Sequence, residues 1–201
     1  MLSLLKDSNQ RLLQMVNNLL DTVRYGEGSL PAHFKPIRIV RLSHSCLQEM
    51  SLLAKSKGVV VICARANADF QVQADDQAIR SLVANLLRNA IKVAGEDGTV
   101  VVSLQANTDS MEIRICDSGP GISQSDRQNL FQCFWQAHPT RSGSFGTGLG
   151  LYLCNQIAEH HGGTIRYERD QSSTRFSVTL PLSVELPAEV LRMACAPAEA
   201  V

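Results

Sequence analysis

Three short segments of the chain contain residue types suited to binding a nucleotide. Residues 85–92 read NLLRNAIK, residues 117–122 read DSGPGI and residues 146–151 read GTGLGL. The first offers amide oxygens and an ammonium group, which suit a metal ion and phosphate. The second offers a carboxylate beside glycines, and the third a glycine-rich entry into a helix, which favours anions. Each pattern is weak alone, but their occurrence together predicts a nucleotide site.

The first segment has helical spacing. Asn85, Asn89 and Lys92 are four and three residues apart, so a helix places them on one narrow edge beside an apolar face. Asparagine is a poor residue inside a helix, and two at this spacing need a reason. Amide oxygens are ligands that Mg²⁺ accepts, and Lys92 is a point charge suited to phosphate. An amphipathic helix with a polar edge is the alternative for this segment alone.

The second segment ends an alternating strand at Asp117. An ionised aspartate only accepts hydrogen bonds, so it can bind the exocyclic amine of adenine. Guanine would present a carbonyl oxygen at that position, with no proton between two acceptors, and this mismatch predicts adenine specificity. Gly119 and Gly121 permit positive φ and a close approach of the base. A plain turn after a strand is the alternative.

The third segment lies at the end of a loop rich in Gly, Ser and Gln, residues 118–147. Loops of this length in a compact domain are usually functional. Phe131 and Phe134 either anchor the loop to the core or belong to a lid over the nucleotide. Arg141 is either a ligand of the terminal phosphate or a solvated loop residue.

Composition narrows the classes of function. The chain has 201 residues, with 19 basic and 19 acidic side chains, so binding to nucleic acid or to an anionic membrane is not expected. It contains no apolar run long enough for a membrane helix and no signal-peptide pattern. The six cysteines form no C-x-x-C pair, which indicates reduced thiols in a cytoplasmic protein.

The periodicity of apolar residues predicts the surrounding elements. Leu5, Leu12 and Leu19 recur every seven residues, which predicts a coiled-coil-like helix over residues 1–25 that needs a partner. Continuous apolar character predicts a strand at 59–62 that is buried on both faces. The other expected elements are helices over 39–57, from the cap at Asp75 and Asp76 to 94, and over 149–160; a short strand at 69–73; and hairpins of 100–104 with 111–116 and of 164–168 with 175–180.

These segments resemble the ATP-binding catalytic domain of bacterial sensor histidine kinases, within the gyrase, chaperone, histidine kinase and MutL superfamily. The resemblance implies a Bergerat-type α/β sandwich, a mixed sheet packed on helices, preceded by one long coiled-coil-like helix. It divides the chain into the second helix of a dimerisation and phosphoacceptor hairpin (1–28), a linker (29–37), the catalytic domain (38–182) and a tail or linker (183–201).

The resemblance also implies roles for individual residues. ATP and Mg²⁺ are the implied cofactors, with Mg²⁺ on Asn85 and Asn89. The implied catalytic residues are Asn85, Asn89, Lys92 and Arg141. The residues implied to bind the nucleotide are Asn85, Asn89, Lys92, Asp117, Gly119, Gly121, Ile122, Phe134, Gly146, Thr147, Gly148, Leu149, Gly150 and Thr179.

The implied activity is autophosphorylation of a histidine, followed by transfer to an aspartate of a response regulator or receiver domain. The segment that carries the family's phosphoacceptor histidine is absent from this chain, and His44 resembles it only superficially. Hydrolytic members of the superfamily have a glutamate base where this chain has Asn85, so slow hydrolysis and a kinase are expected. A homodimer through residues 1–25 is a further expectation. The alternatives are a serine kinase of the superfamily, and an ATP-binding or degenerate module that docks on another kinase.

Overall fold

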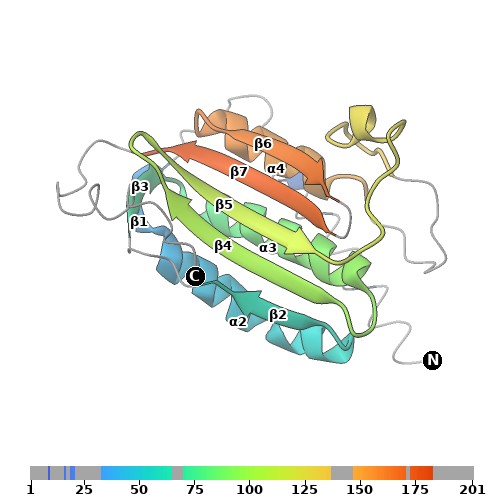
Figure 1. Ribbon diagram of the computed structural model, residues 1–201. Helices are drawn as coiled ribbons and strands as arrows, with labels where there is room; N and C mark the ends of the chain where they lie inside the picture. The colour runs from blue at the N-terminus through green and yellow to red at the C-terminus, as the bar shows by residue number, and fades with distance from the viewer. Residues whose placement is uncertain are drawn as a thin grey trace.

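A five-stranded mixed sheet is the framework of the molecule (Figure 1). The computed structural model describes Asn9, Val16, Leu19 and Leu20, and residues 33–64, 70–136, 147–170 and 173–182. In the order β2-β4-β5-β7-β6, the first pair is parallel and the others are antiparallel. The strands are β2 (Val60–Cys63), β4 (Thr99–Ala106), β5 (Ser110–Asp117), β6 (Thr164–Arg169) and β7 (Thr174–Pro181).

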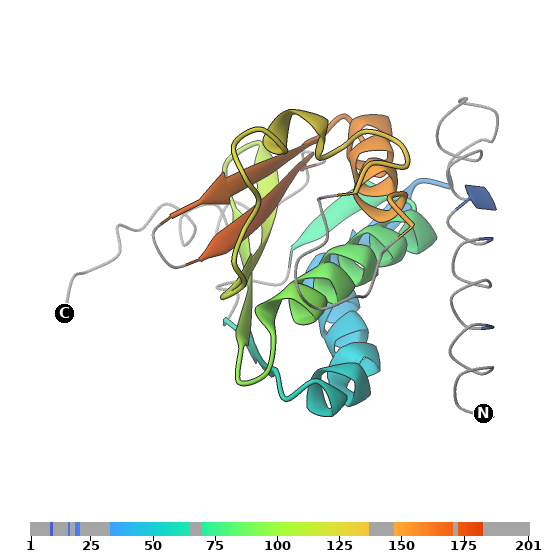
Figure 2. The ribbon, with the colours of Figure 1, turned by 90° about the vertical axis from the view of Figure 1, so that its right-hand side faces the viewer.

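Three helices cover one face of this sheet: α2 (Ile39–Ser56), α3 (Asp76–Ala94) and α4 (Gly150–His160) (Figure 2). Their apolar faces meet the inward side chains of the alternating strands. On β5, Met111, Ile113 and Ile115 are fully buried, whereas the residues between them are only half-buried. The layered arrangement confirms the predicted α/β sandwich, and both predicted hairpins are present.

The prediction that the first strand of the sheet is buried on both faces is wrong. Val60 and Ile62 of β2 are 56% and 47% exposed. The strand lies at the edge of the sheet, where β4 is its one described partner, and no described helix covers its outer face (Figure 1). A short apolar run cannot report which neighbours a strand will have.

A small second sheet, which the sequence did not fully predict, joins β1 (Lys35–Arg38) to β3 (Gln71–Ala74) in antiparallel register. The first three residues of β1 lie in the stretch expected to be a linker, 29–37. Only Ile37 of its four residues is buried, so no alternation was visible in the sequence.

Part of the prediction falls outside the described residues. Of the expected helix over residues 1–25, only Asn9, Val16, Leu19 and Leu20 are described, each as helical, and the tail 183–201 is not described. Across the part that is described, no helix is long and apolar enough to cross a membrane. The five described cysteines are free thiols, but only Cys46 and Cys154 belong to the core.

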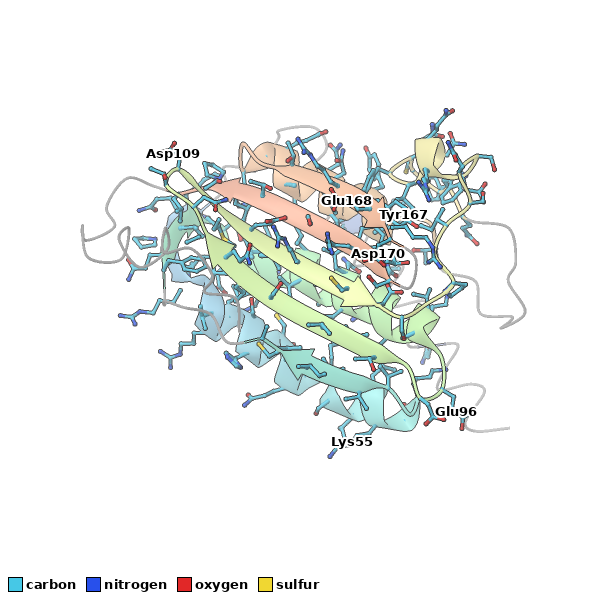
Figure 3. The ribbon with its side chains drawn as sticks, in the orientation of Figure 1. Lys55, Glu96, Asp109, Tyr167, Glu168 and Asp170 are labelled. Carbon is cyan, nitrogen blue, oxygen red and sulfur yellow. The ribbon has the colours of Figure 1, made fainter. Side chains whose placement is uncertain are left out.

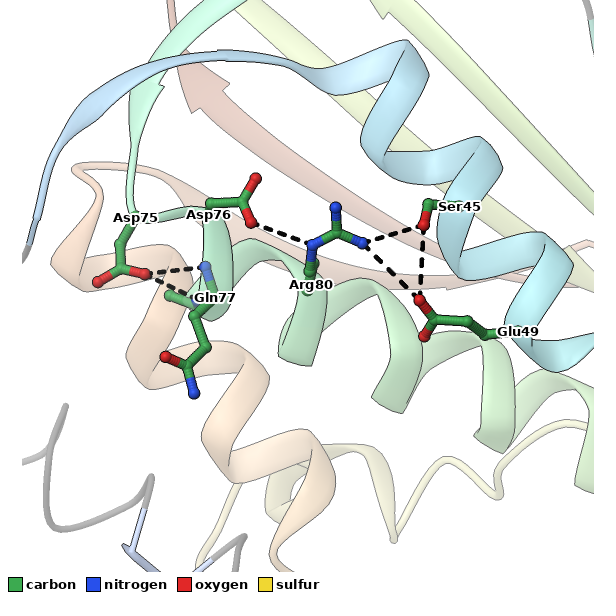
Figure 4. Close-up of polar contacts among 7 residues, drawn as sticks. Ser45, Glu49, Asp75, Asp76, Gln77 and Arg80 are labelled. Atoms are coloured by element: carbon green, nitrogen blue, oxygen red, sulfur yellow. Dashed lines mark hydrogen bonds and ion pairs between the residues drawn. The ribbon is translucent and has the colours of Figure 1, made fainter.

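The start of α3 is fixed by polar contacts to its own backbone and to α2 (Figure 4). As predicted, Asp75 is the N-cap, and its Oδ1 accepts hydrogen bonds from the N–H groups of Gln77 at 2.9 Å and Ala78 at 3.1 Å. Arg80 donates to Asp76 at 3.0 Å and to Ser45 on α2 at 3.2 Å. The cap contributes about 1 kcal/mol, whereas the half-exposed ion pair contributes less. These contacts fix where α3 begins and how it lies against α2, and so they position Asn85 and Asn89.

A buried histidine connects the end of α4 to the start of α3. The His161 side chain accepts the N–H of Asp75 at Nε2, at 3.1 Å, and its Nδ1 lies 2.7 Å from the carbonyl oxygen of Ile157. The proton must therefore be on Nδ1, and the ring is neutral. Burial lowers the pKa of His161, and the nearby charge of His160 adds to this effect. The ring of Phe34 packs against His161 at an interplanar angle of 54°, with centroids 4.9 Å apart.

We expect the stability of the domain to fall as the pH drops below the ordinary histidine range. The pKa of His161 is lower in the folded than in the unfolded chain, so its contribution is complete above about pH 6.5 and is lost as the pH falls through the folded value. His161→Gln retains an acceptor for Asp75 and should weaken this pH dependence, by about 1 kcal/mol. Urea unfolding of the wild type and of His161→Gln at several pH values measures this difference in pH dependence. The exposed His44, changed to Gln, is the control, and an equal effect there would contradict the assignment.

Candidate nucleotide site

The polar edge of α3 faces the first residue of α4. Asn85 is only 6% exposed despite its polar side chain. A Cβ at Gly150 would lie 3.5 Å from Oδ1 of Asn85 and 4.0 Å from Nδ2 of Asn89. Lys92 follows in the last turn of the same helix. The structure therefore brings the two predicted amides to the point where α4 begins.

The start of α4 has the features of a phosphate-binding turn. Its N-cap residue, the buried Leu149, provides no side-chain cap, in contrast to Asp75 at the start of α3. The hydroxyl of Thr147 accepts the N–H of Leu149 at 3.3 Å, which shapes the turn. Since no described side chain caps α4, its first N–H groups are candidate donors for an anion.

Gly148 allows this turn to contact the loop before it. Its φ is +72°, and a Cβ there would lie 2.5 Å from the carbonyl carbon of Phe134. Phe134 itself has a φ of +62° and a side chain that is 59% exposed. Gly146 and Arg141, which are predicted to contact the phosphates, lie outside the described residues.

The opposite end of the site is built around Asp117, the last residue of β5. The residue is 1% exposed, and its Oδ1 accepts the N–H of Gly119 at 2.9 Å. Oδ2 is buried without a hydrogen-bond partner among the described residues. A buried acceptor without a donor is costly, so this oxygen is a specific candidate for binding an amino group of a ligand.

Burial raises the pKa of Asp117 to about 6, although the hydrogen bond from Gly119 and the charge of Arg169 oppose the shift. Because Oδ1 accepts from Gly119, an added proton would reside on Oδ2 and face the ligand's amine. We expect the affinity for adenosine to be constant at high pH and to fall about tenfold per unit below the Asp117 pKa. Calorimetry between about pH 5 and pH 8 tests this, and a flat profile would contradict it.

The loop after Asp117 is attached to the end of β6. The hydroxyl of Tyr167 accepts the N–H of Ile122 at 2.9 Å, and the guanidinium of Arg127 lies 5.4 Å from the centre of the Tyr167 ring. Tyr167, Glu168 and Asp170 are at the opposite end of the sheet from Asp109 (Figure 3). Further along, Leu130 is buried and Phe131 packs partly on the core. Phe131 thus anchors the loop, while the exposed Phe134 is the candidate to cover a ligand.

The helix α3 connects the two ends of the site. We call the start of α4 with Asn85 and Asn89 the phosphate end, and Asp117 with Gly119 the base end. Asn85 and Asn89 face α4, and a Cβ at Gly119 would lie 2.7 Å from the carbonyl oxygen of Val93. Val93 follows Asn89 by about one turn of α3 and Asn85 by about two turns, or about 6 Å and about 12 Å along the helix. The site therefore suits an elongated ligand with a base at one end and an anionic group at the other.

Thr179, which was predicted to bind the nucleotide, does not lie beside the other candidate site residues. It pairs with Glu112 and Thr164, and so shares the outer face of the sheet, away from the helices. Thr174 instead pairs with Asp117 and is 3% exposed. Thr174 and its other partner Arg169 were not predicted, because their proximity to Asp117 depends on strand register rather than on local sequence.

Comparison with known proteins agrees with this geometry. Residues 74–184 match the family described as histidine kinase-, DNA gyrase B- and HSP90-like ATPase. The chain belongs to this family. The matched range contains both ends of the candidate site, so the family assignment and the geometry concern the same residues.

Relatives and solved structures include histidine kinases. The circadian input-output histidine kinase CikA of Synechococcus elongatus is 33% identical over 87% of this chain and 24% of its own length, so the chain spans about a quarter of that relative. Full-length ShkA in complex with AMPPNP has a TM-score of 0.78 and 24% identity, over 92% of this chain and 39% of that chain. Histidine kinase ThkA in complex with response regulator protein TrrA has a TM-score of 0.69 and 19% identity, over 87% of this chain and 49% of that chain. These two structures show the shared fold.

Proposed function

We propose that this chain is the ATP-binding catalytic part of a two-component sensor histidine kinase. The observation that carries the proposal is the buried, unpartnered Oδ2 of Asp117 at the far end of α3 from the uncapped start of α4. This oxygen would accept the amine of adenine, while Gly119 and Gly121 let the base approach the backbone. ShkA, which shares the fold, is described as a complex with AMPPNP, an ATP analogue.

The phosphate end is assigned to residues around the start of α4. The backbone of Gly146, Thr147, Gly148, Leu149 and Gly150 would hold the phosphates at the start of the helix. Lys92 and Arg141 would neutralise phosphate charge, and Ile122 and Phe134 would cover the nucleotide. Thr179 is not retained, because Thr174 has the position beside Asp117.

Mg²⁺ fits the donor set of α3. Among the described residues no three His, Cys, Asp or Glu side chains form a metal site, so a metal here would use amide and phosphate oxygens. Asn85 and Asn89 would hold the ion, which would neutralise charge on the phosphates. The amides would orient the triphosphate, and the buried start of α4 would exclude water from it.

The acceptor in this proposal is a histidine in another part of the full-length protein. Its unprotonated imidazole nitrogen would attack the γ-phosphorus, a P–N bond would form as the P–O bond to ADP breaks, and the proton on the other ring nitrogen would leave to solvent. Beyond Asp76, α3 contains no carboxylate that could activate water. This supports transfer over hydrolysis.

The partners follow from the same assignment. An aspartate of a response regulator would receive the phosphoryl group next, and ThkA, which shares the fold, is described in complex with such a regulator. Residues 1–28 would be the second helix of the phosphoacceptor hairpin and could form a homodimer, with a linker at 29–37, the domain at 38–182 and a tail at 183–201. A cytoplasmic location is part of this proposal.

Phosphoryl transfer to a supplied hairpin is the decisive test. The chain would be incubated with Mg²⁺, ATP labelled at the γ-phosphate and a histidine-containing helical hairpin from a relative. We expect an acid-labile, alkali-stable label on the hairpin, which is lost in Asn89→Ala. The alternative, a regulatory module that docks on another kinase, predicts binding of ATP without transfer to any hairpin and capture of the kinase through residues 1–25.

A further inference from the structure

Arg169, the last residue of β6, occupies a place in the base end that the sequence did not single out. Arg169 pairs with Thr174 of β7, which in turn pairs with Asp117 of β5. Residues directly opposite one another in neighbouring strands share a face, so these three residues lie in a row on the helical side at one end of the sheet.

Gly119 connects Arg169 to Asp117. The N–H of Gly119 donates to Oδ1 of Asp117 at 2.9 Å, and its carbonyl oxygen accepts from Nη1 of Arg169 at 3.1 Å. The same Nη1 donates to the hydroxyl of Thr174 at 3.1 Å. One guanidinium nitrogen therefore fixes both the turn after Asp117 and the strand beside it.

The guanidinium is also held by close packing. Gly121 has a φ of +75°, and a Cβ at this position would overlap the guanidinium of Arg169. The glycine therefore makes room for the arginine as well as for the base. A planar group confined in this way loses little further freedom when it holds its hydrogen bonds.

We propose that Arg169 is a positioning residue of the base end: by fixing Gly119 and placing a positive charge near Asp117, it keeps Oδ2 an unprotonated acceptor and so sets the preference for a 6-aminopurine. The inference rests on the proposed binding of ATP at Asp117. It assigns the preference for a 6-aminopurine to Asp117 and Arg169 together rather than to Asp117 alone.

In the described part of the chain, no second charged side chain acts on Asp117 as Arg169 does. Among the residues that the structure describes, Arg169 is the one charged side chain whose charge acts on the pKa of Asp117. From β7 the neighbour is the uncharged Thr174, and α3, which carries Arg88 and Lys92, approaches Gly119 through the carbonyl of Val93. Removing the charge of Arg169 would therefore leave burial opposed only by the hydrogen bond from Gly119.

The test compares Arg169→Met, which keeps the length of the side chain, with Arg169→Lys, which keeps the charge, in the whole chain. Without any nucleotide, carbon-13 NMR of the Asp117 carboxyl follows its titration directly. We expect the midpoint to move to higher pH in Arg169→Met and to stay near that of the wild type in Arg169→Lys. Thermal unfolding checks that both variants fold.

Binding of adenosine, which lacks phosphates, is the second readout. In Arg169→Met the affinity should fall about fivefold near pH 6.5 and recover to within about twofold near pH 8.5, and Arg169→Lys should restore it at both. An unchanged Asp117 midpoint, or an equal loss of affinity at both pH values, would overturn the proposal while leaving ATP binding intact. If the wild-type chain bound no adenosine at any pH, the proposed function itself would fail, and the role in base preference with it.

Discussion

Asp117→Asn should lower the affinity for ATP about 100-fold or more and shift the preference toward GTP. The N–H of Gly119 needs an acceptor, so the asparagine oxygen would take the place of Oδ1 and its NH₂ group the place of Oδ2. That NH₂ would face the amine of adenine, which places two donors opposite each other in a buried site, at a cost of about 3 kcal/mol. Toward guanine the same NH₂ could donate to the carbonyl oxygen.

Calorimetry with ATP and GTP measures both affinities. Asp109→Asn is the matched control, because this exposed aspartate is at the opposite end of the sheet (Figure 3). Equal ATP affinity in Asp117→Asn and the wild type would contradict the assignment of the base end.

The same substitution should not destabilise the fold. The pKa of Asp117 is raised in the folded chain to about 6, so the carboxyl contributes stability only at low pH, and that contribution is lost as the pH rises through the folded value. Above neutrality the buried carboxylate opposes folding, and an uncharged asparagine removes this effect. Unfolding at about pH 8 should therefore show a variant as stable as the wild type or more so, which separates the loss of binding from the loss of structure.

Gly148→Ala is the second change with a large expected effect. An alanine at a φ of +72° is strained by about 1 kcal/mol, and its Cβ would also overlap the backbone of Phe134. The turn before α4 and the loop would have to separate, so ATP binding should weaken about 100-fold. Adenosine should still bind, because the contacts at Asp117 are unchanged.

Gly95→Ala is a matched control for this experiment. Gly95 has a similar φ of +77°, but nothing lies within 4 Å of a Cβ there. Because its ψ is −178°, a backbone conformation that few residues other than glycine adopt, Gly95→Ala should lose about 1–3 kcal/mol of stability, with ATP binding retained. If both alanine variants bound ATP equally well, the contact between Gly148 and Phe134 would have no role in holding phosphate.

The parts of the site that depend on local sequence were predictable. The spacing of Asn85 and Asn89 identified the polar edge of a helix, and Asp117 followed from the end of an alternating strand. Asp75 was visible as a cap. Each inference needed only a few consecutive residues, because helix periodicity and capping are local.

The parts that depend on the pairing of distant strands were not predictable. Arg169 and Thr174 approach Asp117 only through the register of β5, β7 and β6, whereas the family resemblance implied Thr179, which lies on the other face of β7. The exposure of β2 likewise depends on its place at the edge of the sheet. Register is set by long-range pairing, which no short segment of the sequence encodes.

A single helix, α3, contacts both the phosphate end and the base end of the site. The distance between these two ends is therefore constant. The product ADP would keep every contact that ATP makes at Asp117. It would lose only the contacts that the terminal phosphate of ATP makes. The product is therefore expected to compete strongly with fresh substrate, and turnover should be set by how readily the segment around Phe134 lets the nucleotide exchange. The proposed kinase domain would therefore respond to the ratio of ATP to ADP as well as to the concentration of ATP.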